Sequence, residues 1–139
     1  MDDLRSILSS HHTKAKKEDT DIEAPSKPEP TVSEIPDIFF DEILPVYKLN
    51  RIEICLLMIL YRGVWCRPNL YRKYGIGPLN SHIELAKSLE IGNDVLLQSL
   101  KNLENLGFIE TIRSGQYFVR KYFTEENDRT FNQTYDNFL

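Results

Sequence analysis

The stretch HIELAKSLEIGNDVLLQSLKNLENLGFIETIRSGQYFV, residues 82–119, decides the fold. In its first half, apolar residues recur at helical spacing in two runs, separated by a turn at 90–93. In its second half, the residues alternate in character over 108–112 and over 116–123, as they do in β-strands, and Gly115 lies at the turn between the two runs. The stretch therefore predicts two short helices joined by a tight turn and followed by a β-hairpin.

Capping residues set the bounds of these two helices. Ser81 or the residue before it caps the first helix, and Glu84 follows as in a capping box. Asn93 caps the second helix, over 94–106, and Gly107 ends it. The expected buried residues are Ile83, Leu85, Ala86, Leu89, Leu96, Leu100, Leu103 and Leu106.

Two further helices are predicted upstream. A short apolar helix over 39–44 follows Pro36 and ends at Pro45. Asn50 and Glu53 then have the spacing of a capping box at the start of a run that is apolar on nearly every face. We expect this run, which ends at Tyr61, to be the central buried helix.

The connection after this helix mixes basic and aromatic residues. Its prolines and glycines between 64 and 80 exclude a regular helix. Basic and aromatic residues alternate within it, namely Trp65, Arg67, Tyr71, Arg72, Lys73 and Tyr74. Such a pattern suits contacts with phosphate and sugar, and it suits equally the stacking of Arg and Tyr on an ordinary domain surface.

The first 35 residues have the composition of a disordered, acidic arm. Residues 1–40 contain nine acids and five bases, and 13–36 contain four prolines and no aromatic residue. Such a segment cannot bury enough apolar area to offset its backbone entropy. Ahead of it, Leu4, Ile7 and Leu8 lie at helical spacing, which fits either a frayed terminus or a short helix that docks on a protein partner.

The chain ends in an aromatic tail. Phe131, Tyr135 and Phe138 are four and three residues apart, which places them on one face of a predicted C-terminal helix. This face must pack either on the chain's own central helix or across a two-fold dimer, and we favour the homodimer. The expected organisation is an arm over 1–35, a folded domain over 36–122 and a tail over 123–139.

Composition narrows the function classes. The chain has 139 residues, of which 41% are hydrophobic, and a net charge of −4. No apolar run is long enough to cross a membrane, and the N-terminus carries acids where a signal peptide carries bases, so we expect a cytoplasmic protein. Two cysteines without a CxxC pair exclude a disulfide framework and a zinc site. Because no catalytic, phosphate-binding or metal-ligand motif occurs, we expect no enzyme activity and no cofactor.

The order of elements resembles a known fold. Residues 82–119 resemble the winged-helix DNA-binding proteins of bacteria, phages and plasmids, including MarR-like regulators. The positions that carry this resemblance are Leu85, Ala86, Leu89, Ile91, Leu96, Leu100, Leu103, Gly107, Ile109 and Gly115. The upstream segment is similar to the N-terminal modules of phage and plasmid replication proteins, at Ile35, Pro36, Phe39, Asp41, Glu42, Leu44, Pro45, Glu53, Leu60 and Arg62.

This resemblance implies an α+β winged helix-turn-helix domain that binds double-stranded DNA in transcription control, replication or plasmid maintenance. In that fold the second helix enters the major groove. The expected DNA-contacting residues are Asn93, Val95, Gln98 and Lys101 on this helix, Arg113, Gln116, Arg120 and Lys121 on the hairpin, and Arg72 and Lys73 on the basic connection.

One alternative remains open at this point. Val95 and Leu97 can cover thymine methyl groups, but exposed aliphatic residues more often contact protein. Asp94 at the start of the helix would repel phosphate. The alternative function is therefore a winged-helix adaptor that binds protein and not DNA. On the second strand we expect Phe118 to be buried and Tyr117 to lie nearer the surface.

Overall fold

The computed structural model describes residues 28–138. The chain divides into two units, Met1–Val32 and Ser33–Leu139. The expected disordered arm and its N-terminal helix lie outside the described residues as far as residue 27, and residues 28–35 contain no helix or strand. Within 28–138, no helix is long and apolar enough to cross a membrane.

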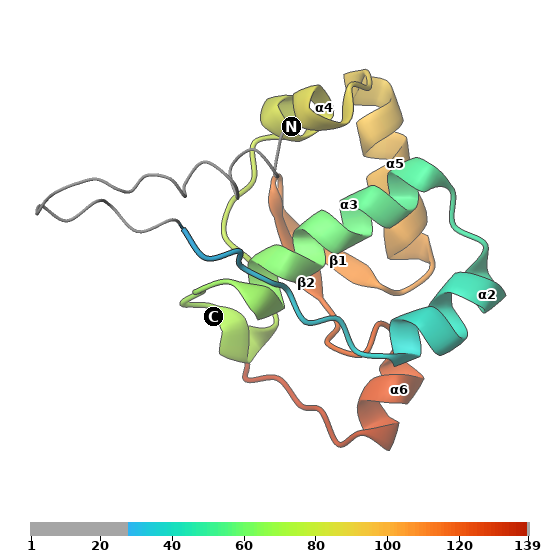
Figure 1. Cartoon of the computed structure of the whole chain (residues 1–139), viewed down its shortest axis with the longest axis vertical. Helices are drawn as coiled ribbons and strands as arrows, with labels where there is room; N and C mark the ends of the chain where they lie inside the picture. Colours follow the sequence, from blue (N-terminus) through green and yellow to red (C-terminus); the bar gives the residue numbers. More distant parts are fainter. Residues whose placement is uncertain (1–27, 139) are drawn as a thin grey trace, which may run out of the picture. The chain divides into compact units, whose positions relative to one another are not determined.

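The larger unit is α+β, with five α-helices and one two-stranded antiparallel hairpin in the described part (Figure 1). Two π-helical segments and one 3₁₀ turn complete it. In chain order the elements are η2 (Phe39–Ile43), α2 (Leu44–Tyr47), α3 (Arg51–Tyr61), η3 (Arg62–Cys66), η4 (Arg72–Tyr74), α4 (His82–Leu89), α5 (Asn93–Asn105), β1 (Ile109–Arg113), β2 (Gln116–Val119) and α6 (Glu125–Thr130).

Helix α3 is central, and the predicted capping box starts it. Asn50 Oδ1 accepts a hydrogen bond from the Glu53 backbone N–H at 2.8 Å, and Glu53 Oε1 accepts one from the Asn50 N–H at 3.0 Å. Figure 1 shows α3 crossing the hairpin, and α3 packs on both α5 and β2. The side chains around it form one core, whose most fully buried members are Ile43, Leu56, Leu57, Tyr61, Val64, Leu96, Leu103, Phe108, Val119 and Phe123.

The first apolar helix does not end at Pro45, contrary to expectation. Helical backbone continues from η2 into α2 and ends at Tyr47. Pro45 lies in the first turn of α2, where its missing N–H and fixed φ are tolerated. Lys48, with a φ of 52°, ends the helix in the left-handed conformation.

Helix α4 begins where the sequence predicted. Ser81 is its N-cap, and Ser81 Oγ accepts a hydrogen bond from the Glu84 N–H at 3.2 Å. The prediction that Ile83 is buried is wrong. At about 100° per residue, Ile83 lies about 110° from the centre of the face that Leu85, Ala86 and Leu89 share, so its side chain points to solvent.

Helix α5 begins one residue earlier than expected. Gly92, with extended backbone, is the N-cap, and Asn93 is already helical, so the predicted cap at Asn93 is wrong. Leu96, Leu100 and Leu103 are buried, as predicted, whereas Leu106 at the C-terminal end is exposed.

The hairpin forms where the alternation predicted it, but β2 ends at Val119. The expectation for its side chains is wrong: Tyr117 is buried and Phe118 is half-buried. Ile109 pairs with Val119 and both face the core, so the two-residue period also turns Tyr117 inward. Phe118 faces the opposite side, where the Tyr135 ring covers it at a centroid distance of 4.8 Å.

The predicted C-terminal helix with three aromatic residues on one face is also wrong. Helix α6 ends at Thr130, and residues 133–138 have no helical backbone. Phe131 packs on the Tyr122 ring, whereas Tyr135 and Phe138 contact aromatic residues elsewhere in the same unit. The tail thus folds back on its own domain, and the homodimer stays a prediction.

Candidate functional site

The exposed face of α5 carries a polar ridge. Asp94, Gln98, Lys101 and Asn105 follow one another at spacings of four, three and four residues, so they lie in one row along the helix. All four are exposed. The buried leucines on the opposite face fix the helix against the core, so these side chains project from a rigid support.

A chain of hydrogen bonds links this ridge to the start of α3. Gln98 Nε2 donates to Asn102 Oδ1 at 2.9 Å, and Asn102 Nδ2 donates to Glu53 Oε2 at 2.9 Å. The Glu53 carboxylate thus serves both the capping box and α5. The sequence had indicated Glu53 only as a cap, because its 49-residue separation from Asn102 leaves no local signal.

Two aliphatic residues flank the ridge. Val95 is 43% exposed and Leu97 is 45% exposed, on opposite sides of it. Asn93, at the first position of α5, is also exposed. The predicted contact residues of α5, namely Asn93, Val95, Gln98 and Lys101, therefore all reach the surface.

The β1–β2 hairpin presents Arg113 but not Gln116 at its surface. Arg113 is exposed, and its Nε donates to Gln116 Oε1 at 3.0 Å. Gln116 is only 3% exposed, and its Nε2 donates to the Gly77 carbonyl at 3.0 Å. Both ends of this amide are satisfied inside the domain, so Gln116 braces the hairpin and is not part of the surface. The Asn80 N–H donates to the Gly115 carbonyl, which holds the hairpin turn against the segment before α4.

The cations that follow β2 have partners in the tail and in η3. Arg120 Nη1 lies 3.1 Å from Asp128 Oδ2, and the Arg120 guanidinium stacks over Phe118. Lys121 Nζ lies over the Trp65 ring, 5.5 Å from its centroid. The Lys121 N–H also donates to the Tyr135 hydroxyl at 2.9 Å, so both residues help to hold the C-terminal segment on the domain.

Arg72 and Lys73 differ from each other in role. The Arg72 side chain donates to the backbone carbonyls of Val64 and Arg67, so it stabilises its own loop. Lys73 is exposed, with Nζ 5.2 Å from the Tyr74 ring centroid. Because η4 follows the C-terminal end of α3, whereas α5 contacts the N-terminal end, the structure does not bring these residues together with the ridge (Figure 1).

Charge differs between two stretches of the chain. Residues 84–113, which include the ridge and Arg113 at the end of β1, contain five acids and three bases. Residues 54–83, which include the connection after α3, contain four bases and no acid. Expected DNA-contacting residues lie in both regions, but only the second region has a surplus of bases.

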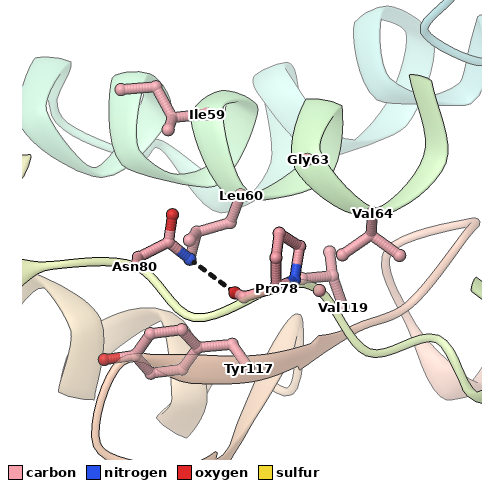
Figure 2. Close-up of a pocket in the computed structure, with 9 residues that line it drawn as sticks. Ile59, Leu60, Gly63, Val64, Pro78, Asn80, Tyr117 and Val119 are labelled. Carbon is pink, nitrogen blue, oxygen red and sulfur yellow. Dashed lines mark hydrogen bonds between the residues drawn. The ribbon is translucent and has the colours of Figure 1, made fainter. Parts of the chain in front are cut away.

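A small cavity lies between α3, β2 and the segment before α4. Its volume is about 20 Å³, and Figure 2 shows Leu60, Val64, Tyr117 and Asn80 around it. Asn80 Nδ2 donates to the Pro78 carbonyl at 3.3 Å beside it. The cavity has room for about one water molecule and not for a small-molecule ligand.

One polar pair joins α4 to the hairpin. His82 Nε2 and the Tyr117 hydroxyl are 2.6 Å apart. Burial raises the pKa of Tyr117 above its ordinary value, so the phenol stays protonated and can donate to His82. No group of three or more His, Cys, Asp and Glu side chains within 28–138 is arranged to hold a metal ion.

Comparisons of the chain with protein-family models, with curated proteins and with solved structures give no match.

Proposed function

We propose that the larger unit is a winged-helix domain that binds double-stranded DNA, in transcription regulation or in the replication or maintenance of a phage or plasmid genome. Helix α5 is the recognition helix and the β1–β2 hairpin is the wing. The order α3, α4, turn, α5 and hairpin supports the assignment.

The observation that carries the proposal is the polar ridge of α5. Gln98 can pair with an adenine edge, and Lys101 can contact guanine or phosphate. Both lie on a helix whose opposite face is locked into the core, which fixes the positions of the side chains that contact base edges. Arg113 projects from the wing, where a guanidinium can enter a minor groove.

A second candidate function is a winged-helix adaptor that binds protein. The partial exposure of Val95 and Leu97 favours it, because these residues add apolar area to the same face of α5. The surplus of acids over 84–113 favours it too, since a DNA-binding surface must neutralise phosphates.

Salt-dependent binding separates the two functions. A fluorescent duplex of mixed sequence is titrated with the full chain, and the logarithm of the binding constant is plotted against the logarithm of the salt concentration. Under the proposal, Lys101→Ala and Arg113→Ala each reduce the slope by about 0.9. Arg129→Ala is the matched control, since Arg129 is an exposed cation on α6, outside the ridge and the wing. Absence of duplex binding at low salt refutes the proposal.

A further inference from the structure

The segment Arg62–Tyr74, named here the basic segment, forms a positively charged surface at the C-terminal end of α3. It contains Arg62, Arg67, Arg72 and Lys73, and all four are exposed. No acid occurs between Glu53 and Glu84. The segment itself therefore contributes four positive charges and no negative one, and the acid that the tail brings to it is Asp136, whose N–H donates to the Lys73 carbonyl at 3.0 Å.

Aromatic rings lie among these cations. Tyr71 is 38% exposed, and Tyr74 is half-buried beside Lys73. Phe138 of the tail meets both rings edge-on, at centroid distances of 6.0 Å from Tyr71 and 5.2 Å from Tyr74. This surface thus already accommodates a flat aromatic group.

The basic segment is braced although it contains no long helix. Asn69 Nδ2 donates to the carbonyls of Val64 and Ile76, and the Arg72 guanidinium donates to the Val64 carbonyl at 3.2 Å. These bonds tie the loop to the end of α3. The Tyr71 N–H also donates to Asn69 Oδ1 at 3.1 Å, so the backbone that carries Tyr71 and Lys73 is held in place and loses little conformational freedom on binding.

We propose that the basic segment binds single-stranded nucleic acid, with the sugar–phosphate backbone along Arg67 and Lys73 and an unpaired base on Tyr71. This binding is independent of the duplex contacts proposed for α5 and the wing. A positive surface with accessible aromatic rings is the arrangement that holds single strands without sequence preference. The bases of a duplex are stacked on one another and leave no face for Tyr71.

An anionic membrane fits this surface less well. A protein segment that inserts into a membrane interface commonly does so as an amphipathic helix with a broad apolar face. Within the basic segment, the helical pieces are only five and three residues long. Leu70, at 91%, is the one exposed aliphatic side chain of the segment, which is too little apolar area for insertion.

The test uses the full chain and a fluorescent oligothymidine of about 20 nucleotides, long enough for one site. Arg67→Ala with Lys73→Ala should reduce the salt slope by about 1.4, since each neutralised phosphate of a single strand contributes about 0.7. Tyr71→Ala should weaken binding about 5- to 140-fold with little change of slope, and Tyr71→Phe should bind as the original chain does.

Matched controls separate local contacts from net charge and from the duplex site. Lys87→Ala with Arg129→Ala removes the same charge from α4 and α6 and should leave oligothymidine binding within about twofold. Circular dichroism of each variant verifies folding. Oligothymidine binding with no duplex binding supports this inference and refutes the duplex proposal; the reverse result refutes this inference alone.

Three outcomes overturn the inference. They are absence of oligothymidine binding at about 50 mM salt, an equal loss of binding in the control double variant, and binding to phosphatidylserine-rich vesicles without binding to oligothymidine.

Discussion

Substitution of Asp128 should destabilise the domain, because this buried carboxylate joins the tail to the hairpin. Asp128 Oδ2 accepts hydrogen bonds from the Tyr135 hydroxyl at 2.6 Å and from Arg120 Nη1 at 3.1 Å, and Oδ1 accepts one from the Tyr122 N–H at 3.1 Å. Its side chain is only 4% exposed. Asp128→Ala therefore leaves three donors without an acceptor.

The expected loss can be worked from these contacts. Removal of one partner of a buried ion pair costs about 3 to 5 kcal/mol. The Arg120 side chain is 24% exposed, so water stabilises part of its charge once Asp128 is gone. We therefore expect Asp128→Ala to lower the free energy of unfolding by about 3 kcal/mol. Asp128→Asn keeps one acceptor oxygen, and we expect a loss of about half that size.

Urea denaturation at neutral pH measures these losses. Arg129→Ala is the control, because Arg129 and Glu125 are both 70% exposed and such a pair contributes less than about 0.5 kcal/mol. A double-mutant cycle between Asp128→Ala and Tyr135→Phe isolates the tail contact, and its coupling should exceed about 0.5 kcal/mol. If Asp128→Ala costs no more than Arg129→Ala, the tail is not part of the domain and the reasoning fails.

Three further predictions concern stability. Burial raises the pKa of Tyr135 above its ordinary value, whereas the phenol of the unfolded chain ionises near 10. The free energy of unfolding should therefore hold below pH 10 and fall above it, and it should fall less steeply in Tyr135→Phe. Urea midpoints that stay flat to about pH 11 would contradict this. Asn50→Ala removes the α3 cap and should cost about 1 kcal/mol in thermal unfolding, whereas Asn50→Ser, which can still cap, should cost less; equal losses would exclude the cap as the cause. Gly115 has a φ of 87°, and an added Cβ would overlap the Asn80 carbonyl. Gly115→Ala should therefore lower the free energy of unfolding by more than about 1 kcal/mol. Gly63→Ala is the control and should change it little, because nothing lies within 4 Å of a Cβ added there.

Local signals predicted the elements of this fold well. The capping box of Asn50 and Glu53, the Ser81 cap and the glycine at the hairpin turn each act within a few residues, so the sequence contains the whole signal. The helices between Phe39 and Asn105 and the hairpin consequently lie where the patterns indicated, with bounds shifted by one or a few residues at several ends, whereas the helix predicted for the C-terminal tail does not form.

The sequence predictions were wrong where contacts between residues far apart in the chain determine the structure. The inward turn of Tyr117 depends on strand pairing, and the half-burial of Phe118 depends on a ring 17 residues later in the chain. The aromatic tail had helical spacing, but separate aromatic partners and the Asp128 contact hold it in an irregular path. Spacing alone could not reveal these partners.

The candidate site shows the same division. Exposure of Gln98 and Lys101 follows from helical periodicity, which the sequence displays. The burial of Gln116 does not follow from any local pattern, because it depends on a hydrogen bond to the Gly77 carbonyl, 39 residues away. The separation of the basic segment from α5 likewise required the direction of α3, which no local pattern contains.

Backbone amide chemical shifts, followed during titration of the full chain with a short duplex, test the central claim most directly. The largest shifts on addition of duplex are expected in residues 93–105 and at Arg113. Oligothymidine, in contrast, should shift residues 67–74 and leave α5 unchanged. Unchanged α5 and Arg113 signals at saturating duplex, or duplex-induced shifts confined to the basic segment, would contradict the assignment of α5 as the DNA-contacting helix.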